Sequence, residues 1–137
     1  MKKSYKYRIY PNKEQQEKIS QFFGCSRKMY NLLLDWWISA YKEYKTDGTP
    51  IGTLPQPTFY KKQEEYSYLK DCDSVALATA RINLNRALNN FFNSKKGKRK
   101  GKKVRFPKFK KKGKCKDSYS TFNNYDCIKI TDNYISL

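Results

Sequence analysis

The feature that most constrains this chain is a stretch of 22 residues, from Lys95 to Lys116, in which 14 side chains are basic and none is acidic. The formal net charge of the chain is +18, and this stretch supplies most of it. So many lysines cannot be buried together, so the stretch is expected to lie on the surface. A positive patch of this density indicates a polyanionic partner. Nucleic acid is favoured over an anionic membrane, because the stretch lacks the periodic apolar face of an interfacial helix.

Aromatic residues are set into the same region, in the sequence VRFPKFKKKGKCKDSYSTF. A disordered basic tail would not need Phe106, Pro107 or Phe109. The lysines would neutralise phosphates, while the two phenylalanines either anchor the segment on a folded core or offer rings on which bases stack. Both interpretations of the rings stay open at this point. For residues 95–103, a solvated and disordered loop is the alternative to a binding surface.

The residues before the basic stretch predict one strand and several helices. Alternation of apolar and basic side chains predicts a strand over residues 4–11. Asn12 and Gln15 have the spacing of a capping box and predict that a helix begins there. Apolar spacing then predicts one helix up to Gly24 and a second over residues 26–45, arranged as a hairpin or a helix-turn-helix-like pair.

A loop is predicted over residues 46–57, followed by a short helix from Thr58 to about Leu69. The clearest helix begins at Asp73 or Ser74, either of which can cap it. Its expected buried stripe consists of Leu77, Ala80, Leu84, Leu88 and Phe91. Its opposite face carries Arg81, Asn83, Asn85, Arg86 and Asn89. These are either ordinary solvated side chains or contacts to phosphates and base edges.

Strands are predicted beyond the basic stretch, in the segments SYSTF and CIKITDNYISL. Ile128 and Ile130 share one face, and Asp132-Asn133 is the expected two-residue hairpin turn. The chain stops at Leu137, within the apolar alternation of the returning strand. We therefore expect a sequence that is truncated at its C-terminus.

The residues that most active sites and metal sites depend on are scarce. There is no histidine, the commonest general base and metal ligand. The four cysteines contain no C-x-x-C pair, so buried or idle thiols are expected rather than zinc ligands. Gly97 and Gly101 are one residue too close for a phosphate-binding G-x-x-x-x-G-K-[ST] loop. We expect no catalytic residue, no metal site, no cofactor and no small-molecule substrate in this chain.

The ends and the hydropathy of the chain bear on its location. The N-terminal lysines are followed by no apolar stretch, so no signal peptide is predicted. No run approaches the roughly 18 apolar residues that are needed to span a membrane. We therefore expect a cytoplasmic protein without a membrane partner.

Four motifs, in the right order, resemble the OrfB/TnpB proteins that bacterial insertion sequences encode. YKYRIYPNKEQQEKISQFFGCSRKMYN resembles the family's opening strand, helix and G-x-x-R-x-x-Y-N segment, with Gly24, Arg27, Tyr30 and Asn31 at those positions. DSVALATARINLNRALNNFF resembles the family's helix that ends in F-F. FPKFKKKGKCKDSYST is similar to its F-P-[RK]-F-K and S-Y-[ST] segment, and IKITDNYISL to a strand pair. Together the motifs cover nearly the whole chain.

The resemblance implies an α+β fold, with an incomplete wedge-type β-barrel and an inserted helical recognition lobe. It divides the chain into a first barrel strand (1–11), the helical insertion (12–93), a basic loop (94–117) and truncated barrel strands (118–137). The family's members act as RNA-guided DNA endonucleases related to type V CRISPR effectors. Their C-terminal half supplies a RuvC-like metal nuclease and a zinc finger. The resemblance therefore implies a transposon-encoded bacterial fragment that binds guide RNA and target DNA at the nucleoid without cutting.

The expected interface combines the basic stretch with two further places. The expected nucleic-acid-binding side chains are Arg27, Lys28, Arg81, Lys98, Arg99, Lys100, Lys102, Lys103, Arg105, Lys108, Lys110, Lys111 and Lys112. Sequence preference is expected at Ser74, Val75 and Ala78 and at Asn123 and Asn124, because the resemblance places these regions beside the target-adjacent duplex. Ser74 has the alternative role of a helix cap, and the two asparagines that of a turn.

Two other functions stay open. A standalone helix-turn-helix regulator would use residues 26–45 as its recognition helix, although Trp36 and Trp37 of that helix look like core residues. A structural RNA binder of the ribosomal-protein kind would use the lysine loop, but the four ordered motifs do not favour it.

Overall fold

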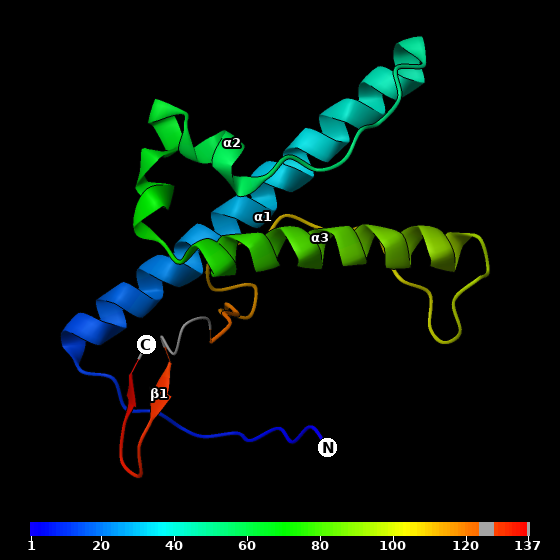
Figure 1. Cartoon of the computed structure of the whole chain (residues 1–137). Helices are drawn as coiled ribbons and strands as arrows, with labels where there is room; N and C mark the ends of the chain where they lie inside the picture. The colour runs from blue at the N-terminus through cyan, green and yellow to red at the C-terminus, as the bar shows by residue number, and fades with distance from the viewer. Residues whose placement is uncertain (124–127, 137) are drawn as a thin grey trace.

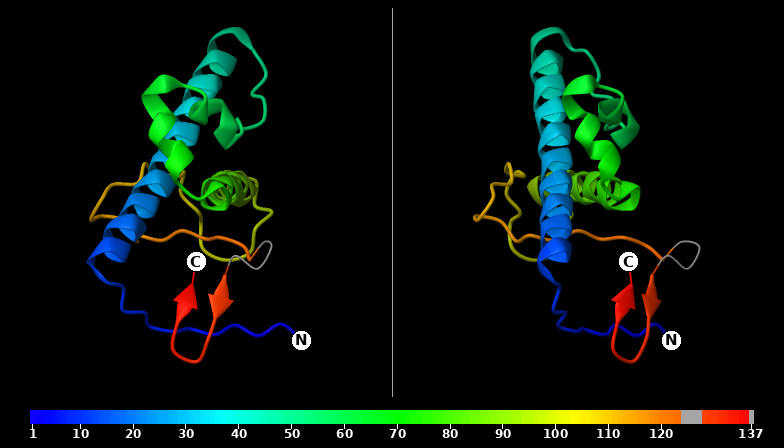
Figure 2. Two further views of the ribbon diagram at one scale, coloured as in Figure 1. Left: turned by 60° about the vertical axis from the view of Figure 1, so that its left-hand side comes forward. Right: turned by 90° about the vertical axis from the view of Figure 1, so that its left-hand side faces the viewer.

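The structure is a computed structural model that describes residues 1–123 and 128–136. Its elements are, in chain order, α1 (Lys13–Asp47), α2 (Pro57–Lys61), the 3-10 helix η1 (Glu64–Asp71), α3 (Ser74–Lys95), β1 (Lys129–Ile130) and β2 (Ile135–Ser136). Helices α1 and α3 cross, and their C-terminal ends extend away from the crossing (Figure 1). The small β-hairpin lies apart from the helices, next to the N-terminal segment (Figure 2).

Helix α1 begins where the sequence predicts. Asn12 Oδ1 accepts a hydrogen bond from the Gln15 N–H, and Gln15 Oε1 accepts one from the Asn12 N–H, each at 2.9 Å, so the capping box is confirmed. The helix ends at Gly48, whose φ of 76° is a left-handed conformation that glycine adopts without strain. The predicted break at Gly24 is wrong, because α1 runs through this residue without interruption.

The apolar residues on both sides of Gly24 explain why the helix continues. Phe22, Cys25, Met29 and Leu33 follow one another at spacings of three and four residues, so a single stripe passes the glycine without a change of phase. The last three of these side chains are buried. Burial of this stripe outweighs the roughly 1 kcal/mol that glycine costs inside a helix relative to alanine.

Replacing Gly24 with alanine is therefore expected to raise the free energy of unfolding by about 0.5–1 kcal/mol. The new Cβ has room, because the nearest atom is Nη2 of Arg27 at 3.9 Å. Gly48→Ala is the matched control and is expected to destabilise, since φ is positive there. Urea unfolding followed by circular dichroism measures both changes. Destabilisation by Gly24→Ala would argue for a joint at this position and against the continuous helix.

The core lies between α1, α3 and the segment that joins them. Its buried side chains are Cys25, Met29, Tyr30, Leu33, Leu34, Leu54, Tyr60, Leu69, Cys72, Ala76, Leu77, Ala80, Leu84 and Leu88. The predicted stripe of α3 is thus buried except for Phe91, which is half-buried. Asp73 Oδ1 accepts a hydrogen bond from the Val75 N–H at 2.9 Å, so Asp73 is the residue that caps α3.

Between α1 and α3, the chain forms α2 and η1 where one short helix is expected. The Tyr60 hydroxyl of α2 donates a hydrogen bond to the Leu32 carbonyl of α1 at 3.3 Å. Cys72, which follows η1, forms a disulfide with Cys25 of α1. Of the expected buried or idle thiols, Cys25 and Cys72 are buried as expected but are bonded to each other, whereas Cys115 is free and half-buried. Both contacts hold the joining segment against α1.

The expected β-barrel is wrong, because the protein is mostly helical. In the part of the chain that the structure describes, β1 and β2 form a single antiparallel pair, and neither residues 1–11 nor residues 118–122 form a strand. Tyr5, Tyr7 and Ile9 keep the alternation of a strand but are 70%, 75% and 49% exposed. Alternation predicts a strand only where a neighbouring backbone supplies hydrogen bonds. Although the hairpin lies nearby, no backbone group of the described chain pairs with Tyr5, Tyr7 or Ile9.

The predicted hairpin at the C-terminal end is confirmed. Lys129 pairs with Ser136 and Ile130 with Ile135. The next residues, Thr131 and Tyr134, flank the turn, and the Thr131 N–H donates to the Tyr134 carbonyl at 2.8 Å. The turn therefore falls at Asp132-Asn133, as the sequence predicts.

Candidate nucleic-acid interface

The basic segment, defined here as residues 95–116, leaves the end of α3 and returns to α1 (Figure 2). Its first part is a loop that is closed at its base, where the Val104 N–H donates to Ser94 Oγ at 3.0 Å. Gly97 and Gly101 have φ values of 71° and 102°, which let the chain turn back. The loop carries the exposed predicted residues Lys98, Arg99, Lys100, Lys102 and Lys103.

Phe106 anchors the segment on the helices. Its ring centroid lies 5.5 Å from that of Trp37 on α1 and 5.3 Å from that of Phe91 on α3. Aromatic pairs at such distances stabilise a contact beyond the apolar area that they bury. The anchoring interpretation therefore holds for Phe106. Phe109 differs, because it is 46% exposed.

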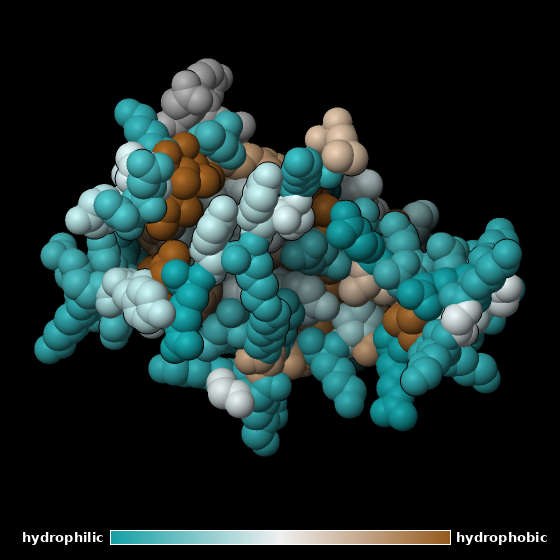
Figure 3. Space-filling model, turned by 90° about the horizontal axis from the view of Figure 1, so that it is seen from below, coloured by the Kyte–Doolittle hydropathy of each residue, from teal (hydrophilic) through white to brown (hydrophobic). Residues whose placement is uncertain are grey.

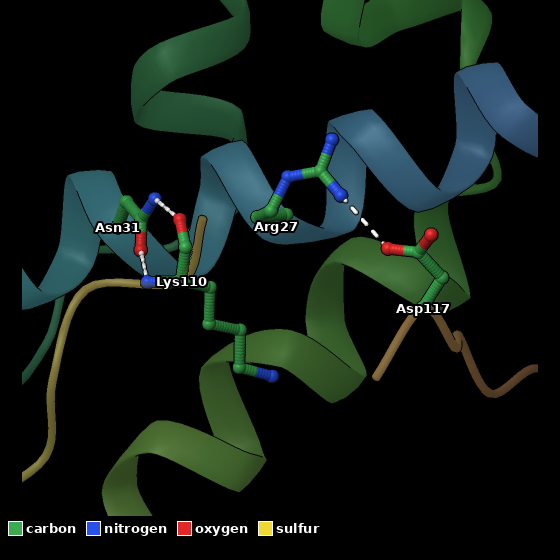
Figure 4. Close-up of polar contacts among 4 residues, drawn as sticks. All are labelled: Arg27, Asn31, Lys110 and Asp117. Carbon is green, nitrogen blue, oxygen red and sulfur yellow. Dashed lines mark hydrogen bonds and ion pairs between the residues drawn. The ribbon is translucent and has the colours of Figure 1, made fainter. Parts of the chain in front are cut away.

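Asn31 on α1 holds the backbone of the basic segment by two hydrogen bonds (Figure 4). Its Nδ2 donates to the Lys110 carbonyl, and its Oδ1 accepts from the Lys110 N–H, both at 2.8 Å. The Lys110 ammonium lies 4.3 Å from the ring centroid of Tyr30, in a cation–π contact. Burial raises the pKa of the Tyr30 phenol, so the ring beneath this ammonium stays neutral.

The chain beyond Lys110 is fixed to the first half of α1. Arg27 Nη1 donates to Asp117 Oδ1 at 2.9 Å in an ion pair (Figure 4). Two residues later, the Tyr119 ring lies 5.6 Å from Phe22 and 5.8 Å from Phe23 between ring centroids. The end of the basic segment is therefore held by charge and by aromatic packing together.

These contacts meet α1 in reverse order of sequence. Contacts from residues 106 to 119 fall on α1 positions that run from 37 back to 22, so the segment lies antiparallel to the helix along one face. Fifteen helical residues measure about 22 Å. A DNA strand carries one phosphate per ~3.4 Å of helix axis, so this length matches about six phosphates of one strand.

The side chains between the anchors remain available to a polyanion. Arg105, Lys108, Lys111 and Lys112 are exposed, whereas Lys110 is half-buried. Within the described residues, these cations form no ion pair with an acidic side chain. Hydrophilic side chains cover most of the face that is seen from below, with small hydrophobic patches between them (Figure 3).

Three other predicted residues contact the protein's own chain. Arg81 donates from Nη2 to the Leu54 carbonyl at 2.9 Å and from Nε to the Pro55 carbonyl at 3.1 Å, so it fixes the loop before α2. The Lys28 ammonium lies 5.5 Å from the ring centroid of Tyr66. Arg27, the third, is the partner of Asp117. Of these, the structure brings only Arg27 to the basic segment.

The residues expected to read sequence lie at two separate places. Ser74 is exposed and its Oγ accepts a hydrogen bond from the Lys61 ammonium at 3.2 Å, while Val75 and Ala78 are half-buried. Asn123 Oδ1 accepts from the Ile128 N–H at 2.9 Å. Asn124 lies outside the described residues. The Ser74 and Asn123 side chains are thus both exposed, and each accepts a hydrogen bond from another residue of the same chain.

Sequence reasoning missed Asn31 and Tyr30 as residues that shape the interface. Both occupy fixed positions of the G-x-x-R-x-x-Y-N motif, and of its four fixed positions only Arg27 is a predicted site residue. A signal was present, because Asn31 stands four residues after Arg27 and therefore on the same face of a helix. Spacing alone does not tell which distant segment such a face contacts.

Replacing Asn31 with alanine is expected to lower the free energy of unfolding by about 1–3 kcal/mol, because it leaves two half-buried backbone groups of Lys110 without partners. The Lys110 amide should also lose its protection against hydrogen exchange. Asn89→Ala, on the exposed face of α3, is the matched control and is expected to change stability little. Thermal unfolding and exchange by NMR give the two readouts. Retained protection at Lys110 would contradict the role of Asn31.

Within the described residues, no group of three or more His, Cys, Asp or Glu side chains is placed to hold a metal ion. The same part of the chain contains no helix that is both long and apolar enough to cross a membrane.

Comparison with known proteins identifies the family. Residues 1–46 match the helix-turn-helix domain of OrfB proteins; in this chain they form the N-terminal segment and most of α1. A Streptomyces pristinaespiralis protein named "Putative RNA-guided DNA endonuclease" is 31% identical over 118 residues, which are 86% of this chain and 27% of that protein. The virulence protein VsdF of Salmonella dublin is 37% identical over 111 residues, which are 76% of this chain and 88% of that protein. The chain thus spans about a quarter of the first relative and most of the second, and it belongs to the OrfB/TnpB family, whose N-terminal part it represents.

Proposed function

We propose that this chain binds nucleic acid through its basic segment, as the part of a transposon-encoded RNA-guided DNA endonuclease that holds guide RNA and target DNA. The observation that carries the proposal is the fixed course of the segment along α1. Phe106, the Lys110 backbone and Asp117 are all held, while lysines between them stay exposed. A backbone that is ordered before binding loses less entropy when the ligand arrives.

Two further facts support DNA as one of the ligands. The family match is to a helix-turn-helix domain, a class of domain that binds DNA. The Streptomyces relative carries a name that describes an RNA-guided DNA endonuclease. The net charge of +18 fits a polyanion of either kind.

We also propose that this chain binds without cutting and needs no metal or other cofactor for binding. Its own residues support this: it has no histidine, and none of its acids within the described residues belongs to a metal-holding group. Nucleases of the metal-dependent kind need carboxylates that converge on the ions.

The same experiment tests binding and cutting. The purified chain is mixed in separate reactions with labelled duplex DNA and with a labelled structured RNA. Each mixture is prepared once with magnesium and once with a chelator in place of magnesium. We expect retarded complexes in both conditions and no shortened product. Absence of any complex at low salt would contradict the binding proposal, and magnesium-dependent products would contradict the proposal of binding without cutting.

For sequence preference we propose the exposed Ser74 at the start of α3 and the exposed Asn123, because serine and asparagine side chains can hydrogen-bond to base edges. A bidentate contact of Asn123 with adenine would have to replace or share its bond from the Ile128 N–H. Selection from randomised duplexes shows whether a preferred sequence exists. A motif that Asn123→Ala leaves unchanged would remove Asn123 from this role.

A further inference from the structure

We propose that Phe109 is a stacking site for an unpaired nucleobase, so that the basic segment takes single-stranded nucleic acid in particular. This rests on the proposed nucleic-acid binding and adds to it the strandedness of the ligand. It also gives the exposed phenylalanine a role different from that of Phe106.

The backbone on both sides of Phe109 is fixed. The next residue, Lys110, has both its N–H and its carbonyl bonded to Asn31 at 2.8 Å. Three residues earlier, Phe106 is packed on α1 and α3 through Trp37 and Phe91. The Phe109 ring therefore projects from a defined point of the surface and not from a loose tail.

The ring is nevertheless left largely open to solvent. Phe109 is 46% exposed, and within the described residues it makes no aromatic or cation–π contact. The neighbouring Lys110 ammonium lies over Tyr30 and not over Phe109. Burying a phenylalanine side chain stabilises a contact about as strongly as burying any apolar side chain. An exposed ring held at a fixed place can therefore gain this stabilisation by binding the face of an apolar or aromatic group.

The surroundings of the ring select a nucleic acid as the ligand. Its sequence neighbours Lys108, Lys111 and Lys112 are exposed, and the whole segment from 95 to 116 contains no acid. Alternation of cations with an exposed ring is the arrangement by which proteins hold single strands, with phosphates on the cations and a base on the ring. In a duplex the bases are already stacked on each other and cannot reach the ring without being extruded.

The test compares Phe109→Ala, Phe109→Leu and Phe109→Tyr on single strands of about 12 nucleotides, oligo-dT and oligo-rU, and on a duplex of the same length. Binding is measured by fluorescence anisotropy over a salt series. We expect Phe109→Ala to lose about 5- to 150-fold on both single strands, with an unchanged salt slope and little change on the duplex. Phe109→Leu should be similarly weak because it lacks a π face, and Phe109→Tyr should bind like the unchanged protein.

Phe59 on α2 supplies the matched control. It is 53% exposed, and in the right-hand view of Figure 2 α2 and the basic segment lie on opposite sides of α1. Phe59→Ala should leave single-strand binding intact. Equal losses in Phe59→Ala and Phe109→Ala, equal losses on single strand and duplex, or full binding by Phe109→Leu would each overturn the stacking site. A loss confined to oligo-rU or to oligo-dT would restrict the site to RNA or to DNA.

The two proposals fail in different ways. If the unchanged protein binds with a steep salt slope and Phe109→Ala binds equally well, only the stacking site is refuted. If the unchanged protein binds neither single strand nor duplex, the proposed function fails and the stacking site with it.

Discussion

Replacing Lys108, Lys110, Lys111 and Lys112 together with glutamine is expected to flatten the salt dependence of duplex binding by roughly 3–4 units of slope. Each neutralised phosphate contributes about −0.9 to the slope of log K against log salt, because it releases condensed counterions. With about six phosphates in reach of the basic segment, the unchanged protein should show a slope of roughly −5. The variant should therefore bind about 10³- to 10⁴-fold more weakly at about 0.1 M salt, if the electrostatic contribution vanishes near 1 M.

The control for this variant removes the same charge elsewhere. Lys13, Lys18, Lys62 and Lys70 are exposed and lie outside the basic segment. Their replacement by glutamine should change the slope by much less, since only long-range attraction is lost. If both quadruple variants flatten the slope equally, binding depends on net charge alone. An unchanged slope in the Lys108–Lys112 variant would place the interface on another surface.

The local features of the fold could be predicted because short-range rules decide them. The capping box at Asn12 and Gln15, the buried stripe of α3 and the turn at Asp132-Asn133 each depend on residues a few positions apart. The predicted break at Gly24 is wrong at the same local level, because the apolar stripe continues past the glycine without interruption. The cost of one glycine is small beside the burial of several apolar side chains.

The barrel is what the resemblance implies, and alternation predicts only the single strand over residues 4–11, which exists only if a partner strand pairs with it. Tyr5, Tyr7 and Ile9 satisfy the pattern, yet they remain exposed and pair with no strand in the described residues. The disulfide between Cys25 and Cys72 is also a long-range feature, because it joins residues 47 positions apart. Neither the pairing of strands nor that of distant cysteines follows from spacing.

The candidate site was predictable in composition but not in arrangement. The charge density of the sequence identifies the basic segment, and its aromatic residues indicate that it is anchored. Which phenylalanine is the anchor depends on the position of Trp37, which contacts Phe106. The bonds between Asn31 and the Lys110 backbone join residues 79 positions apart. The sequence predicts that Arg81 contacts phosphates. In the structure, the Arg81 guanidinium instead donates to two backbone carbonyls of the preceding loop. Residue type indicates what a side chain can bind, and only the fold shows what it does bind.

Replacing Leu84 with alanine is expected to lower the free energy of unfolding by about 2–5 kcal/mol, because the side chain is fully buried and its removal leaves a cavity. For a domain of this size, that corresponds to a melting temperature lower by roughly 5–15 °C. Ile82→Ala is the matched control: it lies two residues away on α3, is 45% exposed, and should cost less than about 1 kcal/mol. Thermal unfolding by circular dichroism measures both.

The same pair of variants separates stability from binding. Helix α3 carries Phe91 and Ser94, which hold the basic segment, so partial unfolding of Leu84→Ala should reduce the fraction of competent protein. The charges are unchanged, however, so well below the melting temperature the salt slope of Leu84→Ala should equal that of the unchanged protein. Equal stability losses in Leu84→Ala and Ile82→Ala would show that α3 does not bury the stripe described here. A changed salt slope in fully folded Leu84→Ala would show that the packing of α3 sets the number of phosphate contacts. That outcome requires the basic segment to leave α1 while the core stays intact.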